Sequence, residues 1–195
     1  MLLKFISLAL FLTFLAVLLK FVFFKKEIEK NKRKYNFPIT YKGHEYWYSR
    51  AVATELYAYA QDENGELYIL ANKRGKGCPN ANGLWNVPSG YLEFNESGEH
   101  RAVTECYEEC GIEISEEEIK LVDVETRPLS ESQNIKLRYF YQMPKTINHY
   151  KFTDEHSEYD EVDEIKFIKL TELNEYEFAF GQSLIIEKLE KLINI

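Results

Sequence analysis

Three glutamates at helical spacing are the residues of this sequence that point most directly to chemistry. Glu105, Glu108 and Glu109 are separated by three and one positions, with no lysine among them. Carboxylates spaced in this way share one side of a helix and repel one another unless a cation compensates. A hard divalent cation such as Mg²⁺ could do so, because it binds carboxylate oxygens together with water and phosphate groups. A solvated acidic helix face is the alternative interpretation.

The segment that must position these glutamates has the pattern of a short amphipathic helix. Ser97 is a suitable N-cap, and Gly111 stands where a left-handed residue would end the helix. At about 100° per residue, the glutamates fall on one side. The other side, which should pack on the core, carries Val103, Cys106, Tyr107 and Cys110. The sequence therefore predicts a helix over roughly 97–110 with one apolar and one acidic face.

Further fixed positions surround this helix. Gly90 is followed by five residues and Glu96, and after seven more residues comes the stretch TECYEECGI. This spacing resembles the Nudix box, GxxxxxE, seven residues, then REUxEExGU with U apolar. The preceding GLWNVPSGYLE also resembles the usual lead-in to that box. Thr104 is the one departure, because the family has arginine there. The sequence is thus similar to Nudix hydrolases from roughly Ser49 to its end.

The resemblance implies a fold, a reaction and a set of site residues. The fold would be an α/β (α+β) Nudix-like α/β/α sandwich with a mixed sheet. The reaction would be attack of water on a nucleoside diphosphate linked to another group, assisted by Mg²⁺ or Mn²⁺. Glu105 and Glu108 would be catalytic. The metal ligands would be the backbone carbonyl of Gly90 and the carboxylates of Glu105, Glu108 and Glu109.

Two more acidic positions enter through the same resemblance. A carboxylate from the loop before the last strand often completes such a site, and Glu161 and Glu164 are the candidates here. Their segment is acidic throughout, so a solvated loop is the alternative. Glu96 would shape the loop of the box rather than take part in the reaction.

Thr104 keeps a second class of function open. The family arginine braces the carboxylates through charge-assisted hydrogen bonds, which a threonine hydroxyl cannot replace. Arg101 lies one turn before Glu105 and is a hypothetical substitute. If neither residue supports turnover, the chain would be a catalytically weak or inactive Nudix-fold module that binds or senses nucleotides.

Charge and cysteine content exclude other classes. The 195 residues carry a formal net charge of −8, and the basic residues are concentrated before position 35. The remainder is acidic, so a nucleic acid polymer is not an expected partner. The three cysteines suggest no disulfide framework, which agrees with a reducing compartment. The sequence fixes neither the substrate nor the oligomeric state.

The N-terminal segment differs in composition from the rest. Residues 1–24 are predominantly apolar and, as a helix, long enough to cross a bilayer, so they predict a transmembrane anchor. A signal peptide and an apolar helix folded onto the domain are the alternatives. Basic residues crowd the following segment, which predicts a single-pass protein of the cell membrane with its catalytic domain in the cytoplasm. The expected divisions are anchor 1–24, basic linker and lead-in 25–47, and hydrolase domain 48–195.

Local patterns give the remaining elements. Two β-rich stretches, 51–61 and 67–74, flank the turn dipeptide Asn64-Gly65 and predict a hairpin. A glycine-rich loop follows at 75–83. Further strands are expected at 85–88, 120–127, 135–142 and from 165, and a final helix at 181–193.

Overall fold

The computed structural model describes residues 14, 18–20, 37–127, 134–157 and 160–191. Most of the predicted anchor at 1–24, and the start of the basic linker, lie outside these residues. No helix in the described parts of the chain is both long enough and apolar enough to span a membrane. The chain divides into two compact units, Met1–Ser49 and Arg50–Ile195.

The first unit contains a hairpin where the sequence predicted no element. Strands β1 (Phe37–Tyr41) and β2 (His44–Tyr48) are antiparallel, with Tyr41 opposite His44. Both loop residues have positive φ, 49° at Lys42 and 80° at Gly43, as a type I′ turn requires. Strands of five residues give only a weak alternating pattern, which explains the missed prediction.

The second unit is built on a seven-stranded sheet with the order β5-β4-β3-β8-β7, while β6 pairs with β3 and β9 with β4. Strand β8 runs parallel to β3, and every other pair is antiparallel, so the mixed sheet that the sequence predicted is confirmed. The strands are β3 (Val52–Gln61), β4 (Leu67–Arg74), β5 (Trp85–Asn86), β6 (Ser89–Tyr91), β7 (Lys120–Glu125), β8 (Ile135–Thr146) and β9 (Val162–Lys169).

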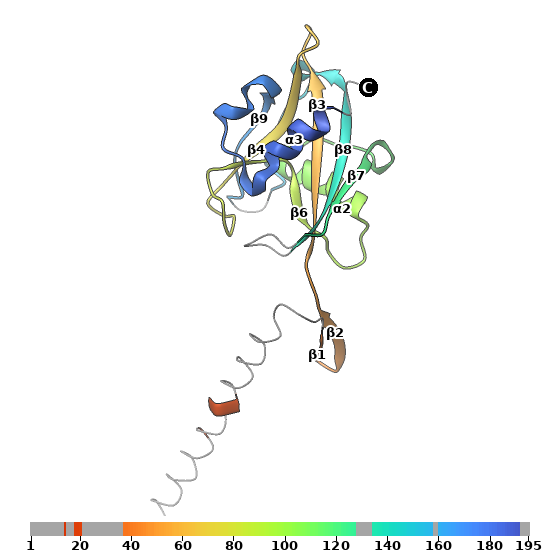
Figure 1. Ribbon diagram of the computed structural model, residues 1–195, viewed down its shortest axis with the longest axis vertical. Helices are drawn as coiled ribbons and strands as arrows, with labels where there is room; N and C mark the ends of the chain where they lie inside the picture. The colour runs from red at the N-terminus through yellow and green to blue at the C-terminus, as the bar shows by residue number, and fades with distance from the viewer. Residues whose placement is uncertain (1–13, 15–17, 21–36, 128–133, 158–159, 192–195) are drawn as a thin grey trace, which may run out of the picture. The chain divides into compact units, whose positions relative to one another are not determined.

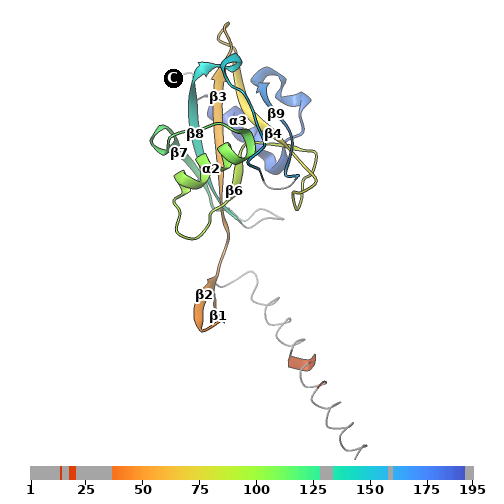
Figure 2. The same ribbon diagram turned by 180° about the vertical axis from the view of Figure 1, so that it is seen from behind.

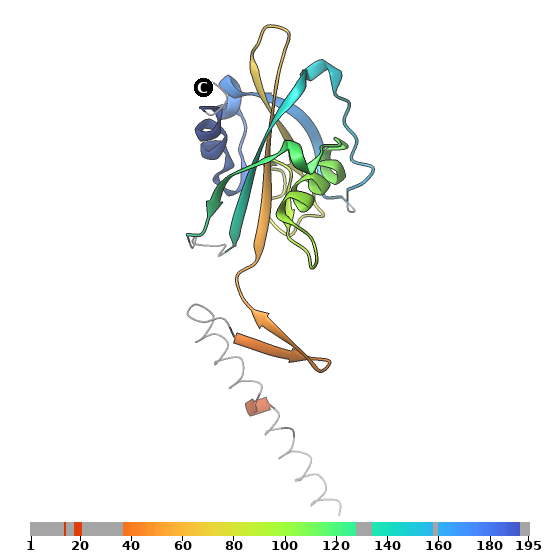
Figure 3. The same cartoon turned by 90° about the vertical axis from the view of Figure 1, so that its right-hand side faces the viewer.

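Helices cover both faces of this sheet. Side chains of β3 alternate between two cores, with Leu56 in the cluster that contains buried residues of α2 (Gly98–Cys110) and Tyr57 in the cluster that contains those of α3 (Gln182–Glu190). Figure 1 shows α3 in front of the sheet. Figure 2, the view from the opposite side, shows α2 in front of it, and Figure 3 shows the sheet between the two helices. The 3₁₀ helices are η1 (Glu116–Glu118), η2 (Ile147–His149), η3 (Leu170–Glu175) and η4 (Ala179–Gly181).

Several element boundaries differ from the sequence prediction. Strand β8 continues past 142 to Thr146, and β9 begins at Val162 rather than at 165. Strand β6 is not among the predicted strands; its three residues are extended because they pair with β3. The final helix, α3, is shorter than the predicted 181–193; it buries Ile186 and Leu189 and leaves Leu184 69% exposed.

One edge of β3 is shared by two partner strands. Residues 59–61 of β3 pair with β4, and residues 53–55 pair with β6. The other edge of β3 pairs continuously with β8, from Val52 opposite Ile135 to Tyr59 opposite Gln142. Strands β4 and β6 therefore pair with different ends of the same edge of β3. A side chain of α2 (Gly98–Cys110) can contact both strands, as Glu109 does with Asn72 of β4 and Ser89 of β6.

Candidate functional site

Helix α2 begins and ends as its sequence predicted. The hydroxyl of Ser97 accepts a hydrogen bond of 3.0 Å from the backbone N–H of His100. Gly111 has φ of 70°, and its N–H donates to the carbonyl of Tyr107 at 2.8 Å. Cys106 and Cys110 are completely buried on the core side. The caps and the core face thus fix the rotation of the helix and the direction of its glutamates.

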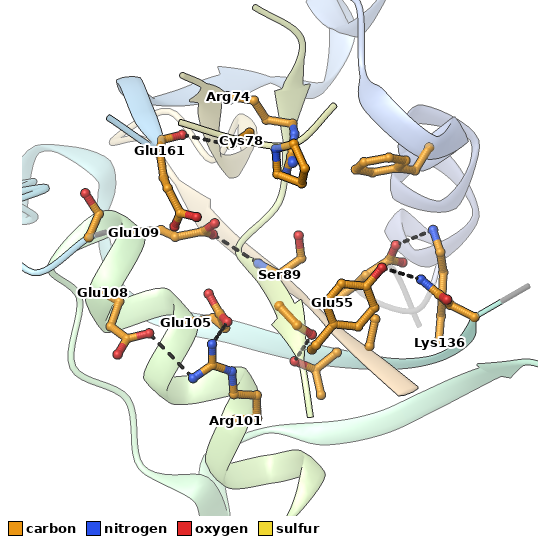
Figure 4. Close-up of a pocket in the computed structure, with 18 of the residues that line it drawn as sticks. Glu55, Arg74, Cys78, Ser89, Arg101, Glu105, Glu108, Glu109, Lys136 and Glu161 are labelled. Atoms are coloured by element: carbon orange, nitrogen blue, oxygen red, sulfur yellow. Dashed lines mark hydrogen bonds and ion pairs between the residues drawn. The ribbon is translucent and has the colours of Figure 1, made fainter. Parts of the chain in front are cut away.

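The acidic side of α2 is not uniformly solvated. Glu105 and Glu109 are only 6% and 8% exposed, whereas the side chain of Glu108 is 39% exposed. All three line a pocket of about 570 Å³ (Figure 4). Carboxylates buried in this way need partners, because burial disfavours their charged form.

Glu109 is held by the two strands that share one edge of β3. Its Oε2 accepts 2.8 Å from Nδ2 of Asn72 in β4 and 3.0 Å from the backbone N–H of Ser89 in β6. Burial, together with the charge of Glu105, nevertheless raises the pKa of Glu109 to about 8. Two neutral donors therefore orient this carboxylate without neutralising it.

Glu105 has a cationic partner on its own helix. The guanidinium of Arg101 contacts the Glu105 carboxylate directly, and its Nη1 lies 3.7 Å from Oε2 of Glu108. Its Nε is also 4.0 Å from Oε1 of Glu96. Burial and the like charge of Glu108 raise the pKa of Glu105, whereas Arg101 lowers it. The net result is a pKa of about 7. Arg101 thus occupies the bracing position that was hypothesised for it.

Gly90 lies against the same carboxylate. A Cβ atom added at Gly90 would be 1.5 Å from Oε1 of Glu105, so any side chain there would displace the carboxylate. The carbonyl of Gly90 accepts a hydrogen bond of 3.5 Å from the hydroxyl of Thr54. Close approach of the carboxylate to the backbone is therefore the physical reason for glycine at this position.

The two acidic loop candidates are separated by the fold. Glu161 lines the pocket, and its backbone carbonyl accepts from the thiol of Cys78. Glu164 pairs instead with Lys166 at 2.9 Å and does not line the pocket. Figure 4 shows Glu161 on the same side of the pocket as Glu109.

Sequence reasoning missed a further carboxylate in the pocket, Glu55 of β3, which is 2% exposed. Its oxygens accept 2.7 Å from Nζ of Lys136 and 3.0 Å from Nε of Arg138. Tyr57 and Gln182 donate to it as well. Burial alone would raise the pKa of Glu55, but the two cations with Tyr57 bring it below its usual value. The available signal was a lone charge within the apolar run AVATELYAYA.

Phe180 is the other residue that the sequence did not single out. It lines the pocket with 44% of its surface exposed and has a left-handed backbone, φ 57° and ψ 18°. A left-handed conformation costs a non-glycine residue roughly 1–2 kcal/mol. Its ring centroid lies 5.2 Å from Cζ of Arg74 and 5.3 Å from Nζ of Lys136.

The α2 side of the pocket has the donors that a hard cation prefers. Three carboxylates and a backbone carbonyl are all oxygen ligands. The pKa values of Glu105 and Glu109 are raised by burial and by neighbouring carboxylates, so a cation bound there would favour their charged forms. No group of three or more His, Cys, Asp or Glu side chains in the described residues is gathered closely enough to hold a metal ion. The residues therefore fit such an ion in chemistry, while their side chains would have to converge around it.

No protein-family model matches the chain. Among solved structures, the NUDIX domain of Shewanella oneidensis NrtR, complexed with ADP ribose, is 14% identical with a TM-score of 0.62 over 85% of this chain and 97% of that one. A mutT/nudix family protein from Listeria innocua is 24% identical with a TM-score of 0.55 over 75% and 96%.

A third match is the bifunctional NMN adenylyltransferase/ADP ribose pyrophosphatase of Francisella tularensis, complexed with AMP and a manganese ion. It is 18% identical with a TM-score of 0.53 over 73% of this chain and 42% of that one. At these identities the similarity establishes the architecture. Together with the sheet order and the position of α2, it shows that the chain has the Nudix hydrolase fold.

Proposed function

We propose that this chain is a hydrolase that cleaves the diphosphate bond of a nucleoside diphosphate linked to another group, with Mg²⁺ or Mn²⁺. The observation that carries the proposal is the pair of buried glutamates, Glu105 and Glu109, that α2 directs into a pocket beside Gly90. The ADP ribose bound to the Shewanella domain, and the AMP and manganese bound to the Francisella enzyme, support this class of ligand.

The glutamates of α2 and the residues around them have separate roles in this proposal. Glu108, Glu109 and the carbonyl of Gly90 would hold the divalent cation. When bound, such a cation neutralises diphosphate oxygens and lowers the pKa of the attacking water. Glu105, which lines the pocket and is contacted by Arg101, would accept the proton of that water. Asn72 and Ser89 orient Glu109 throughout.

The proposal includes a membrane location. Residues 1–24 anchor the chain, and the catalytic domain faces the cytoplasm, as supported by the apolar run and the basic residues after it. Membrane fractions washed with alkaline carbonate should retain the full-length chain and release a variant without residues 1–24. Release of both proteins would contradict the anchor.

One observation favours a second candidate, a nucleotide-binding module without efficient turnover. Arg101 already places a cation among Glu96, Glu105 and Glu108. In that arrangement its guanidinium competes with a metal ion for the same oxygens. Because Thr104 supplies no second cation, displacement of Arg101 would leave the carboxylates without a bracing partner.

Hydrolysis assays with the full-length protein separate the two candidates. Products are measured with Mg²⁺ against ADP ribose, nucleoside triphosphates and dinucleoside polyphosphates, for the wild type and for Glu108→Gln, Thr104→Arg and Glu116→Gln. We expect turnover of at least one compound by the wild type, and a loss of about 100-fold or more in Glu108→Gln. Glu116, which is exposed and pairs with His100, provides the matched control.

Two results would overturn the hydrolase proposal. The first is equal turnover by the wild type and Glu108→Gln. The second is a silent wild type that binds nucleotides and gains activity as Thr104→Arg, which would instead establish the binding module.

A further inference from the structure

Phe180 has a left-handed backbone, although its own side chain is not packed in the core. Its φ of 57° is one that L side chains rarely adopt, yet almost half of the residue is exposed. The next residue, Gly181, also has a positive φ, of 70°. Strain that persists at an exposed aromatic residue in a pocket is a reason to look for a ligand.

The chain on both sides of Phe180 is fixed in place. Phe178, two residues before it, forms a parallel bridge with Trp85. Gln182, two residues after it, accepts a hydrogen bond of 3.0 Å from the N–H of Val87 and donates to Glu55. Gln182 is 1% exposed. The ring of Phe180 is therefore presented by a rigid support, as recognition of a ligand requires.

Two cations accompany the ring. Arg74 and Lys136 both lie within about 5 Å of its centroid, and all three residues line the pocket. The position of Lys136 is set by its ion pair with buried Glu55. The guanidinium of Arg74 is planar and can stack on an aromatic ring as the phenyl group does. This part of the pocket thus offers two surfaces on which a flat, electron-rich ring can stack.

The stacking surface lies apart from the glutamates of α2. Figure 4 shows Glu55 and Lys136 on one side of the pocket, and Arg101, Glu105 and Glu108 on the other. A diphosphate held near the glutamates leaves the rest of its molecule free to extend toward Lys136 and Phe180. The cavity of about 570 Å³ is within the range of small-ligand pockets.

We propose that Phe180, with the guanidinium of Arg74, stacks on the nucleobase of the substrate and so makes the site selective for nucleotides over diphosphates that lack a base. The inference rests on the proposed function for the position of the phosphates. Tyr91 is the other exposed aromatic residue of the pocket, but its hydroxyl is tied to Asn134 at 2.8 Å and it has no comparable strain.

The test compares two ligands that differ only in the base. AMP and ribose 5-phosphate are titrated calorimetrically into the full-length chain with Mg²⁺, and GMP, CMP and UMP are used in the same way. None of these compounds contains a diphosphate, so turnover does not interfere. We expect at least one nucleotide to bind about tenfold more tightly than ribose 5-phosphate, as stacking of one base on an aromatic ring predicts.

Variants assign this preference to a residue. Phe180→Leu should bring the two dissociation constants to within about twofold while leaving that of ribose 5-phosphate unchanged, and Phe180→Trp should retain the preference. Phe94→Leu is the matched control, because Phe94 is 85% exposed and does not line the pocket. Thermal unfolding of each variant confirms that it is folded. If Phe180→Leu does not fold, Phe180→Trp still tests the assignment.

Each remaining outcome overturns the inference. Nucleotides that bind no more tightly than ribose 5-phosphate, or not at all, would exclude a base site. A preference that survives in Phe180→Leu but disappears in Tyr91→Leu would move the site to Tyr91. Failure of the hydrolase proposal looks different, because a chain without turnover would still show the preference that depends on Phe180.

Discussion

Two groups of buried glutamates line the same pocket in opposite electrostatic states. Glu55 is surrounded by donors, with Lys136 and Arg138 at 2.7 and 3.0 Å, and its pKa is lowered. Glu105 contacts one cation, Arg101, and Glu109 accepts hydrogen bonds from the neutral donors Asn72 and Ser89, so their pKa values are raised by burial to about 7 and 8. Burial is similar in the two groups, so the difference comes from the number of charges and donors around them.

The comparison separates a structural carboxylate from carboxylates that are suited to chemistry. Glu55 has its charge compensated within the protein and ties β3 to β8 and α3. Glu105 and Glu109 retain an uncompensated charge, which a proton or a divalent cation from solution can relieve.

Removal of the charge should have opposite effects on stability in the two groups. Glu55→Gln leaves Lys136 buried without its ion partner and should lower the free energy of unfolding by about 3–5 kcal/mol. Glu109→Gln removes a repulsive charge and should be neutral or stabilising at pH 8 in EDTA. Urea unfolding of both variants measures this contrast, and a loss of similar size in both would erase it.

The pH dependence of stability should reflect Glu105 and Glu109. Their folded pKa values lie above the usual 4.5, so the native state binds more protons than the unfolded state between about pH 4.5 and 8. The stability linked to these protons is fully present below pH 4.5 and is lost as the pH rises through 7 to 8. The rise of the Glu105 pKa from 4.5 to about 7 alone corresponds to a loss of about 3 kcal/mol, at about 1.4 kcal/mol for each pKa unit.

Urea unfolding in EDTA at several pH values, for wild type and for the double variant Glu105→Gln/Glu109→Gln, isolates this contribution. The double variant should show a flatter profile above pH 5. Glu55 acts in the reverse direction, because its pKa is lowered and its contribution disappears as the pH falls. Parallel profiles for wild type and double variant would show that the two glutamates are compensated after all.

Arg101→Ala should affect turnover more than substrate binding. Without the guanidinium, Glu105 loses the contact that orients it and that lowers its pKa. We expect kcat to fall about tenfold with little change in KM, and the acidic limb of the pH–rate profile to move to higher pH. Arg101→Lys should recover part of the rate. An unchanged kcat would show that Arg101 does not replace the missing box arginine.

Divalent cations should stabilise the protein through the α2 glutamates alone. At about five times its dissociation constant, Mn²⁺ should raise the free energy of unfolding by about 1 kcal/mol. The increment should vanish in Glu109→Gln and persist in Glu55→Gln, whose baseline stability is lower. Thermal unfolding with and without MnCl₂ measures it, and an equal increment in both variants would place the ion elsewhere.

The sequence predicted those parts of the molecule that depend on local chemistry. The caps of α2 at Ser97 and Gly111, and the hairpin of β3 and β4, follow from residue types and spacing within a few positions. The pairing of β3 with β8 could not be predicted in this way, because it joins residues about 80 positions apart. Glu55 was missed for the same reason, since its partners lie on β8.

The acidic face of α2 shows the same limit at the level of single residues. Helical periodicity placed Glu105 and Glu109 on the side away from the cysteines, but the structure buries both glutamates together with Cys106 and Cys110. Periodicity could not show that this face is also buried, because the burial comes from β4 and β6. Nor does any sequence pattern mark Phe180, whose left-handed backbone depends on the contacts of its neighbours with Trp85 and Val87.

Because Gly90 and Glu105 are in contact, substitutions at these two positions are expected to be coupled. A carboxylate oxygen occupies the space that any side chain at position 90 would need. A substitution at Gly90 must therefore displace Glu105, and a larger residue at 105 would press on the backbone at 90. Related chains that have lost the glycine are expected to have lost the carboxylate as well, so the two positions should covary as one inherited character.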